Sequence, residues 1–194
     1  HIFHDVKNKL NYKKNIDFYI TNSAELNAFA LTRSDDKDTD IININSALIS
    51  MFDDDELRFV VGHEIGHLIT RYARVVRLIN FIFPDPEKVP LILAHRIELW
   101  QKVSELTADR FGFIASPKVE KCVSGFFKMA SGLSTDRIDF DYKAYLIDNE
   151  KILEYFTQNR NMFTHPVNPL RIKAIKLFSE SSLYEDFKNE KEFN

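Results

Sequence analysis

The first third of the chain alternates short apolar runs with polar turn signals. β-Branched and aromatic residues fill three of these runs, and runs of that length and composition are typical of β-strands. The pattern predicts three strands of one small sheet, at residues 16–20, 28–32 and 41–44. Residues 33–40 contain no apolar side chain and are predicted to form a solvated hairpin loop. A calcium site is disfavoured there, because the spacing of the Asp residues does not match a calcium loop.

From residue 45 onward the apolar positions recur with a helical period. Asp53 and Glu56 form a variant of the capping box, and the acidic first turn that follows complements the helix dipole. Prolines at positions 84, 86 and 90 separate the first two long helices. Helices are predicted at about residues 54–80, 91–115, 118–131, 138–158 and 168–180.

These elements predict an α+β fold, mainly helical, with a small three-stranded sheet near the N-terminus. We expect one domain, with the sheet at about 16–45, a helical body at about 46–180 and a polar, frayed tail at 181–194. A chain of 194 residues, 44% of them hydrophobic, is long enough to bury a core without disulfide bonds.

Charge excludes one class of partner. The chain carries 26 basic and 29 acidic side chains, for a net charge of −3, and it has no basic stripe. A nucleic-acid binder needs a surface that neutralises phosphates, so we expect no nucleic-acid partner.

Location is left open by the sequence, with a cytoplasmic or membrane-associated protein slightly favoured over an exported one. The single Cys cannot form an internal disulfide, and no run reaches the roughly 18 apolar residues of a spanning helix. We expect this piece to be soluble. Because it begins at His1, we expect a trimmed or processed piece, and the sequence leaves open whether a targeting or membrane segment was removed upstream.

The candidate chemistry lies in His63-Glu64-Ile65-Gly66-His67, inside the first long helix. Two imidazoles four positions apart share one helix face, with Cβ atoms about 6 Å apart, so both can bind one Zn²⁺. Glu64 lies beside them and can accept the proton of a water on the metal. Chance alone would produce this pattern about 0.012 times in a chain of this composition. The helix is otherwise apolar, so two polar rings need buried partners, and a metal supplies one.

Several residues are candidates for a third protein ligand. A catalytic zinc site commonly has three protein ligands and one open position. Three of the carboxylates share one face of the second long helix, at steps of seven and four residues. Position alone leaves the choice open among His95, Glu98, Glu105, Asp109 and His165.

The order of several segments resembles the M48 family of zinc endopeptidases. After the first motif come Ser104 to Arg110, then Thr164-His165-Pro166, and then Pro169-Leu170-Arg171. Upstream, Asn27-Ala28-Phe29-Ala30 resembles a strand of that family. The resemblance covers about residues 16–175 and implies a zincin-like fold.

The resemblance also implies roles for individual residues. His63, His67 and Glu105 would bind one Zn²⁺ per chain, and Glu64 would be the general base. Asp109 would accept a hydrogen bond from a ligand imidazole and fix its tautomer, or else be a surface residue paired with a neighbouring cation.

Two further roles have open alternatives. His165 either donates a hydrogen bond to the developing oxyanion or belongs to a simple turn. Arg171 either supports the site from behind the ligands or holds the last helix by an ion pair. Other candidates for the oxyanion donor are Tyr142, Tyr145 and Tyr155.

The sequence therefore predicts a zinc-dependent endopeptidase that cleaves extended or unfolded protein segments. The substrate would pair with the sheet edge formed by Asn27, Ala28, Phe29 and Ala30. Two alternatives remain, a catalytically silent binding module of the same fold and a zinc hydrolase with a non-peptide substrate. The oligomeric state cannot be read from the sequence.

Residues 75–93 form an apolar stretch interrupted by charges and prolines. We expect it to pack in the core where the two long helices end. The alternative is a flap or a hairpin that dips into a membrane, because Phe81, Ile82 and Phe83 stand together beside Pro84. Membrane association would otherwise depend on a missing segment.

Overall fold

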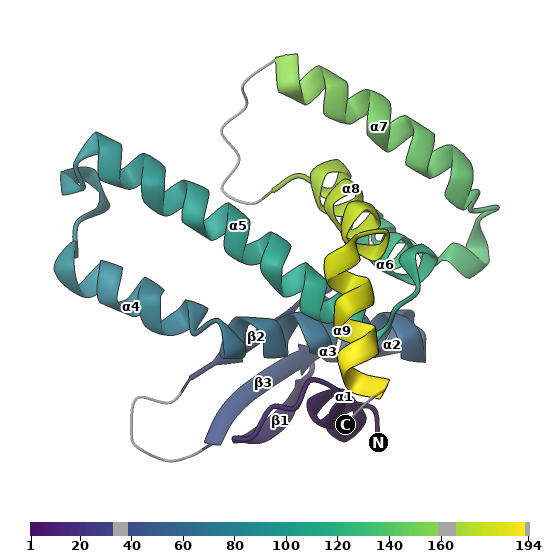
Figure 1. Ribbon diagram of the computed structural model, residues 1–194, viewed down its shortest axis with the longest axis horizontal. Coiled ribbons are helices and arrows are strands. Elements are labelled where there is room, and N and C mark those ends of the chain that lie inside the picture. Colours follow the sequence, from purple (N-terminus) through teal and green to yellow (C-terminus); the bar gives the residue numbers. More distant parts are fainter. Residues whose placement is uncertain (33–38, 159–165, 193–194) are drawn as a thin grey trace.

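The predicted α+β, mainly helical fold class is confirmed (Figure 1). The computed structural model describes residues 1–32, 39–158 and 166–192, so most of the predicted 33–40 loop lies outside the described residues. In chain order the longer elements are α1 (Ile2–Lys9), β1 (Asn15–Thr21), β2 (Ala28–Leu31), β3 (Thr39–Asn45), α2 (Ser46–Met51), α3 (Asp54–Ile69), α4 (Tyr72–Ile82), α5 (Leu91–Ala115), α6 (Val119–Ser131), α7 (Tyr142–Gln158), α8 (Asn168–Ser179) and α9 (Ser182–Glu192). Two short 3₁₀ turns, η1 (Pro86–Lys88) and η2 (Thr135–Arg137), lie between α4 and α5 and between α6 and α7.

The three predicted strands form one sheet in the order β1-β3-β2. β1 runs parallel to β3, while β2 pairs antiparallel with β3, with Ala30 opposite Ile42. The central strand β3 buries Ile42 and Ile44 in the core, as expected for a strand with a neighbour on each side. β2 is an edge strand.

The capping box predicted at the start of α3 is present. The side chain of Asp53 accepts hydrogen bonds from the backbone N–H groups of Asp55 and Glu56, and the Glu56 carboxylate accepts one from the N–H of Asp53. Glu56 is itself buried and paired with Lys128 of α6 at 2.7 Å. The cap therefore fixes both the first turn of α3 and its contact with α6.

Glycines allow α3 and α5 to approach closely. A Cβ atom on Gly112 of α5 would lie 2.7 Å from the backbone oxygen of Phe59 on α3, and one on Gly66 would lie 3.0 Å from the Cα of Ala108. Both distances are too short for a side chain. The two helices therefore meet backbone to backbone, which brings the His-bearing face of α3 close to α5.

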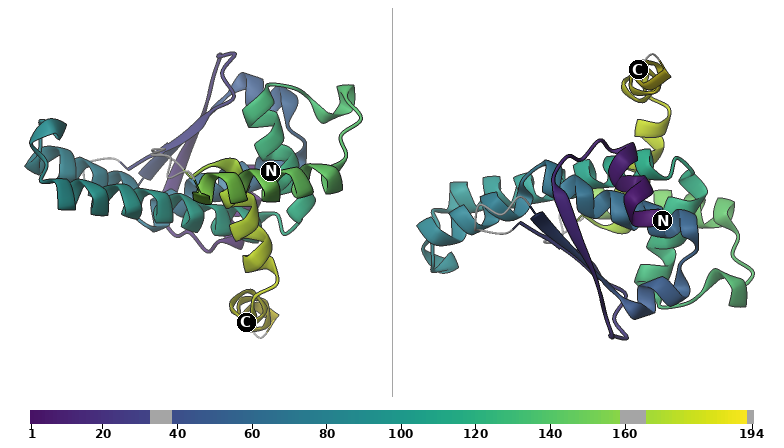
Figure 2. Two further views of the ribbon diagram at one scale, coloured as in Figure 1. Left: turned by 90° about the horizontal axis from the view of Figure 1, so that it is seen from above. Right: turned by 90° about the horizontal axis from the view of Figure 1, so that it is seen from below.

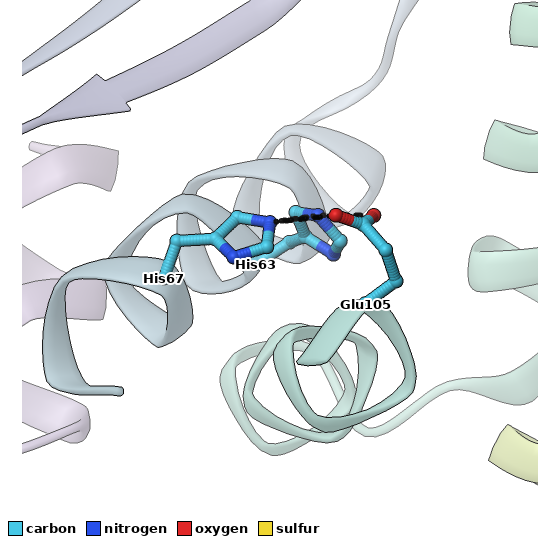
Figure 3. A group of neighbouring side chains, drawn as sticks. All are labelled: His63, His67 and Glu105. Atoms are coloured by element: carbon cyan, nitrogen blue, oxygen red, sulfur yellow. Dashed lines mark hydrogen bonds and ion pairs between the residues drawn. The ribbon is translucent and has the colours of Figure 1, made fainter. Parts of the chain in front are cut away.

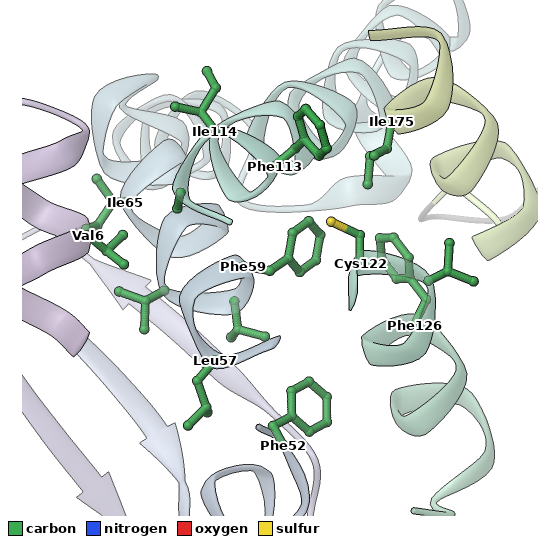
Figure 4. Close-up of a cluster of buried hydrophobic side chains, with 14 of the residues drawn as sticks. Val6, Phe52, Leu57, Phe59, Ile65, Phe113, Ile114, Cys122, Phe126 and Ile175 are labelled. Carbon is green, nitrogen blue, oxygen red and sulfur yellow. The ribbon is translucent and has the colours of Figure 1, made fainter. Parts of the chain in front are cut away.

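The hydrophobic core lies around α3, which packs against α5 and α6, and α8 covers α5 and α6 in turn (Figure 4). Phe59 and Phe126 pack edge to face with ring centroids 5.4 Å apart, and Cys122 and Ile175 are buried beside them. The other side of α3 packs on the sheet through Ile42 and Ile44. α3 is thus surrounded on most sides.

The predicted helix at 54–80 is two helices. α3 ends at Ile69, and Arg71 adopts a left-handed conformation with φ of 56° before α4 begins. The sequence has neither Gly nor Pro at this break, so nothing local signalled it. α7 also begins at Tyr142, later than predicted, because η2 and an extended stretch precede it.

Helices lie at both ends of the described residues, where the sequence pattern predicted none. The tail predicted to be frayed contains α9, which is held by Tyr184 packing against Phe113 and Phe178. α1 was not predicted, and it buries Val6 against the core.

The expected core packing of residues 75–93 is wrong. α4 contains no buried residue, and Phe81, Leu91 and Ile92 are all exposed. Instead, α4 and the first half of α5 form a long hairpin that extends away from the rest of the protein (Figures 1 and 2). Among the described residues, no helix combines the length and the apolar character that crossing a bilayer requires.

Candidate metal centre

His63 and His67 lie one turn apart on α3 and face Glu105 on α5 (Figure 3). The two Nε2 atoms are 3.0 Å apart, and they lie 3.6 Å and 3.4 Å from the carboxylate oxygens of Glu105. Ligand atoms of a tetrahedral zinc site with bonds of about 2.1 Å lie about 3.4 Å apart. The three side chains therefore fit a possible His-His-Glu metal site.

Asp109 and Arg171 lie behind His63. Asp109 is fully buried, and its Oδ1 is 2.9 Å from Nδ1 of His63. Arg171 donates two hydrogen bonds to the same carboxylate, from Nε at 2.8 Å and from Nη2 at 2.6 Å. Burial by itself raises the pKa of Asp109, but the charge and hydrogen bonds of Arg171, together with His63, lower that pKa to about 2.

The ionised Asp109 determines which His63 nitrogen faces the site. A carboxylate without a proton can only accept, so Nδ1 of His63 must donate, and the lone pair is left on Nε2. That atom points at His67 and Glu105. Burial lowers the pKa of His63, but the hydrogen bond and charge of Asp109 outweigh it, and the net shift is upward.

Glu64 is buried next to the ligand cluster. Burial raises the pKa of its carboxyl to about 7, with a further rise from the nearby Glu105. His63, Arg171 and a hydrogen bond from the backbone of Ala30 act in the opposite direction. A carboxyl with this pKa exchanges its proton readily at neutral pH, as a proton carrier must.

A cleft of about 320 Å³ contains these groups, and β2 forms one of its walls. The backbone oxygen of Asn27 accepts a hydrogen bond from Asn45, on the β3 side. Backbone groups of an antiparallel edge strand alternate in direction, so those of Ala28 and Ala30 point away from β3. The backbone contact between Ala30 and Glu64 agrees with this assignment.

Tyr72 is a cleft residue that the sequence did not reveal. Its ring centroid lies 4.9 Å from that of His67, and it stacks on Trp100 of α5 at 5.2 Å. The helix break at Arg71 places Tyr72 over the site. No sequence feature indicated that break, so none indicated that Tyr72 would reach the cleft.

Of the other candidates that the structure describes, none lines the cleft. His95 is an exposed residue near the far end of the hairpin, and Glu98 pairs with Lys102 at 2.6 Å. Tyr145 packs against Phe127, on the α6 side of the molecule. Tyr142 does not line the cleft, while His165 and the side chain of Tyr155 lie outside the described residues.

Two comparisons with known proteins indicate which class of protein this chain resembles. The model of peptidase family M48 matches residues 1–82, which include His63, Glu64 and His67. The chain is also 26% identical over 184 residues to the plastoglobule-localized metallopeptidase 48, chloroplastic, of Arabidopsis thaliana. That alignment covers 87% of this chain and 53% of the relative, so the chain spans about half the relative's length. No solved structure matches.

The chain is similar to peptidase family M48 over its first 82 residues, which include His63, Glu64 and His67. Together with the possible His-His-Glu metal site, the two matches support a metallopeptidase of the M48 type.

Proposed function

We propose that the protein is a zinc-dependent endopeptidase that hydrolyses peptide bonds in extended or unfolded protein segments. The observation that carries the proposal is the position of Glu64. It lies in one cleft with the three candidate ligands and with the edge strand β2. A proton carrier, a metal site and a peptide-pairing edge are the parts that peptide hydrolysis needs.

His63, His67 and Glu105 would hold the zinc ion through two imidazole nitrogens and one carboxylate. Three protein ligands leave a fourth coordination position open, as in catalytic zinc sites. When bound, the ion supplies Lewis acidity, which polarises a carbonyl group and lowers the pKa of water.

Glu64 would move the proton. Its carboxylate accepts a proton from the attacking water and then delivers it to the nitrogen of the departing amine. A bound zinc ion would add positive charge beside Glu64 and so favour its carboxylate, which is the form that accepts the proton.

Asp109 and Arg171 would keep His63 oriented without touching the substrate. The carboxylate of Asp109 holds the ring through Nδ1, and the two hydrogen bonds from Arg171 hold that carboxylate. Partners of this kind typically contribute 10- to 100-fold to metal affinity.

The substrate would lie extended along β2 and pair with the outward backbone groups of Ala28 and Ala30. Main-chain pairing does not depend on the substrate's side chains. It requires a segment whose own backbone groups are available, which favours unfolded or extended protein.

The test compares the wild type with Glu64→Gln on a quenched peptide and on casein. We expect activity to fall by about 100- to 10,000-fold, the usual contribution of a general base. Zinc content should stay at one per chain, because Glu64 is not a ligand. Glu98→Gln on α5 is the matched control and should keep full activity, and a chelator should stop cleavage by the wild type.

Each rival function has its own outcome. A zinc-loaded wild type that cleaves neither substrate would indicate a silent binding module or a non-peptide hydrolase. A fully active Glu64→Gln variant would show that another group carries the proton.

A further inference from the structure

The end of the α4–α5 hairpin exposes a cluster of large apolar side chains. We call this cluster the hairpin tip, and it consists of Leu78, Phe81, Ile82, Leu91, Ile92 and Leu93. Phe81 is 84% exposed, Leu91 is 86% exposed and Ile92 is 75% exposed. The tip lies at the end of the hairpin that is far from the sheet and the core (Figures 1 and 2). Contiguous exposed apolar side chains commonly mark a surface that contacts something else.

The tip side chains are not needed to form the hairpin. A second set of apolar residues lines a hollow of about 220 Å³ inside the hairpin. Val76 and Ile79 come from α4, Phe83 and Val89 from the connection, and Ile97 from α5. Nearer the core, Tyr72 stacks on Trp100, and Arg77 of α4 donates hydrogen bonds to the backbone and side-chain oxygens of Thr32. The hairpin is therefore attached at its base, while its tip faces outward.

The charge of the hairpin differs in sign from that of the whole chain. Residues 71–102 contain six basic side chains and three acidic ones, whereas the chain as a whole has a net charge of −3. Arg74 and Arg96 are exposed on α4 and α5. The turn between the helices carries Asp85, Glu87 and Lys88, with Lys88 paired to Asp85 at 3.2 Å, so the basic excess lies along α4 and α5. An apolar end with basic residues further along both helices matches an anionic bilayer, with acyl chains below negative headgroups.

We propose that the hairpin tip inserts into the interfacial layer of an anionic phospholipid membrane. The tip is a projecting end (Figure 1) on which Phe81, Leu91 and Ile92 stand exposed. Insertion to a depth of about 5–10 Å covers such an end without any shape complementarity. No helix spanning the bilayer is required.

This geometry would place the metal centre outside the headgroup layer. Glu105 follows Leu91 by fourteen residues along α5, which corresponds to about 21 Å at 1.5 Å per residue. The proposal does not depend on the proposed peptidase activity, because binding is measured without turnover.

The experiment is co-sedimentation of the full chain with vesicles of phosphatidylcholine alone or mixed with phosphatidylserine. The tip variant replaces Phe81, Leu91 and Ile92 with Ser. Its matched control replaces Ile147, Leu177 and Leu183, which are also exposed apolar residues on helices but lie away from the hairpin. Circular dichroism verifies that each variant is folded.

We expect the wild type to bind the mixed vesicles. The tip variant should bind at least ten-fold more weakly, equivalent to about 1.4 kcal/mol, and the control should bind like the wild type. A second variant, Arg74→Glu with Arg96→Glu, changes only exposed side chains and should lose the preference for phosphatidylserine. Added salt should weaken the same preference by screening the charges.

Several results would overturn the proposal. They are a wild type that binds neither vesicle, a tip variant that binds as well as the wild type, and a control that loses as much binding. A wild-type dimer in sedimentation that the tip variant dissociates, without vesicle binding, would assign the tip to a protein interface instead.

Discussion

Asp109 has two neighbours whose roles are different. His63 needs an acceptor at Nδ1 to leave its Nε2 lone pair facing the site, and Arg171 provides the positive charge that lets a carboxylate remain ionised where no water reaches it. Removing Arg171 would leave a buried charge without compensation. Asp109 and Arg171 were both predicted from the sequence to support the site, but only the structure shows that they contact each other.

Asp53 is a second carboxylate with a defined role. It is the N-cap of α3, ten residues before His63. It accepts hydrogen bonds from two backbone N–H groups and pairs with Lys121 of α6. Asp53→Ala removes both contacts, and we expect the free energy of unfolding to fall by about 1 kcal/mol, within the usual range of 0.5–2 for an N-cap. Urea denaturation followed by circular dichroism measures the change.

Asp53→Asn removes the negative charge but keeps the helix cap, because Asn retains an acceptor oxygen. Burial by itself raises the pKa of Asp53, but Lys121 and the backbone N–H groups of Glu56 and Asp55 lower it below 3.8. A lowered folded pKa stabilises the protein above the unfolded value, and this stabilisation is lost as pH falls through the folded value. The stability difference between the wild type and Asp53→Asn should therefore shrink below about pH 4. A difference that grows on acidification would contradict this account.

Among the elements, α3 and α5 matter most, because their contact determines the distance between the ligands. Gly112→Ala should destabilise the protein and weaken zinc binding. A helix gains about 0.5–1 kcal/mol from Gly to Ala, but overpacking costs about 1–3 kcal/mol, and here the new Cβ would meet the backbone oxygen of Phe59 at 2.7 Å. Calorimetric zinc titration and thermal unfolding measure the two effects.

Gly125→Ala on α6 is the control for that change. Its Cβ would meet only a ring carbon of Phe52 at 3.5 Å, an ordinary contact. We expect this variant to be as stable as the wild type or slightly more so, with unchanged zinc affinity. Equal losses in both variants would mean that the close approach of α3 and α5 is not the cause.

The elements that carry strong local signals were predictable. The capping box at Asp53, the prolines before α5 and the β-branched runs of the sheet all fix local backbone geometry, and each appears where the sequence indicated. The break at Arg71 was not predictable, because its cause lies in tertiary packing. α1 and α9 are stabilised by tertiary contacts, which a local pattern does not reveal. Val6 and Tyr184 are buried, and Ile2, Phe3 and Phe187 pack against the core beside them.

The candidate site was predicted in its composition and less well in its arrangement. The spacing of His63 and His67 follows from helix geometry alone, whereas Glu105 could be chosen only through the resemblance to M48 proteins. Tyr72 and the backbone contact of Ala30 with Glu64 depend on how α4 and β2 fold against α3, so the sequence did not indicate them. The prediction that residues 75–93 would be buried was wrong for a related reason. An apolar segment does not show which other element, if any, will cover it.

At the scale of the whole molecule, the core and the candidate metal centre adjoin each other. Phe59 lines the cleft, and the guanidinium of Arg171 lies 4.5 Å from the ring centroid of Phe126. The core itself is built from hydrophobic side chains of several helices (Figure 4). We therefore expect the protein to stay folded when a chelator removes zinc, with an unchanged circular dichroism spectrum.

Zinc should still raise the melting temperature by mass action. At a free concentration 100 times the Kd, a ligand stabilises the folded state by about 2.7 kcal/mol, which corresponds to about 5–10 °C for a chain of this size. Scanning calorimetry with and without zinc measures the shift, and His67→Ala should abolish it. Unfolding by the chelator would show that the hydrophobic core does not hold the fold without the ion, and an equal shift in His67→Ala would show that zinc binds elsewhere.

The backbone contact between α3 and α5 has a consequence for ion selectivity. Two candidate ligands come from one helix and the third from the other, so the spacing of the donor atoms is governed by main-chain packing rather than by adjustable loops. Such a spacing changes little from one ion to the next. Ions that demand six oxygen ligands or a square-planar arrangement would be poorly accommodated, and discrimination against magnesium, calcium and copper(II) would be built into the crossing of two helices.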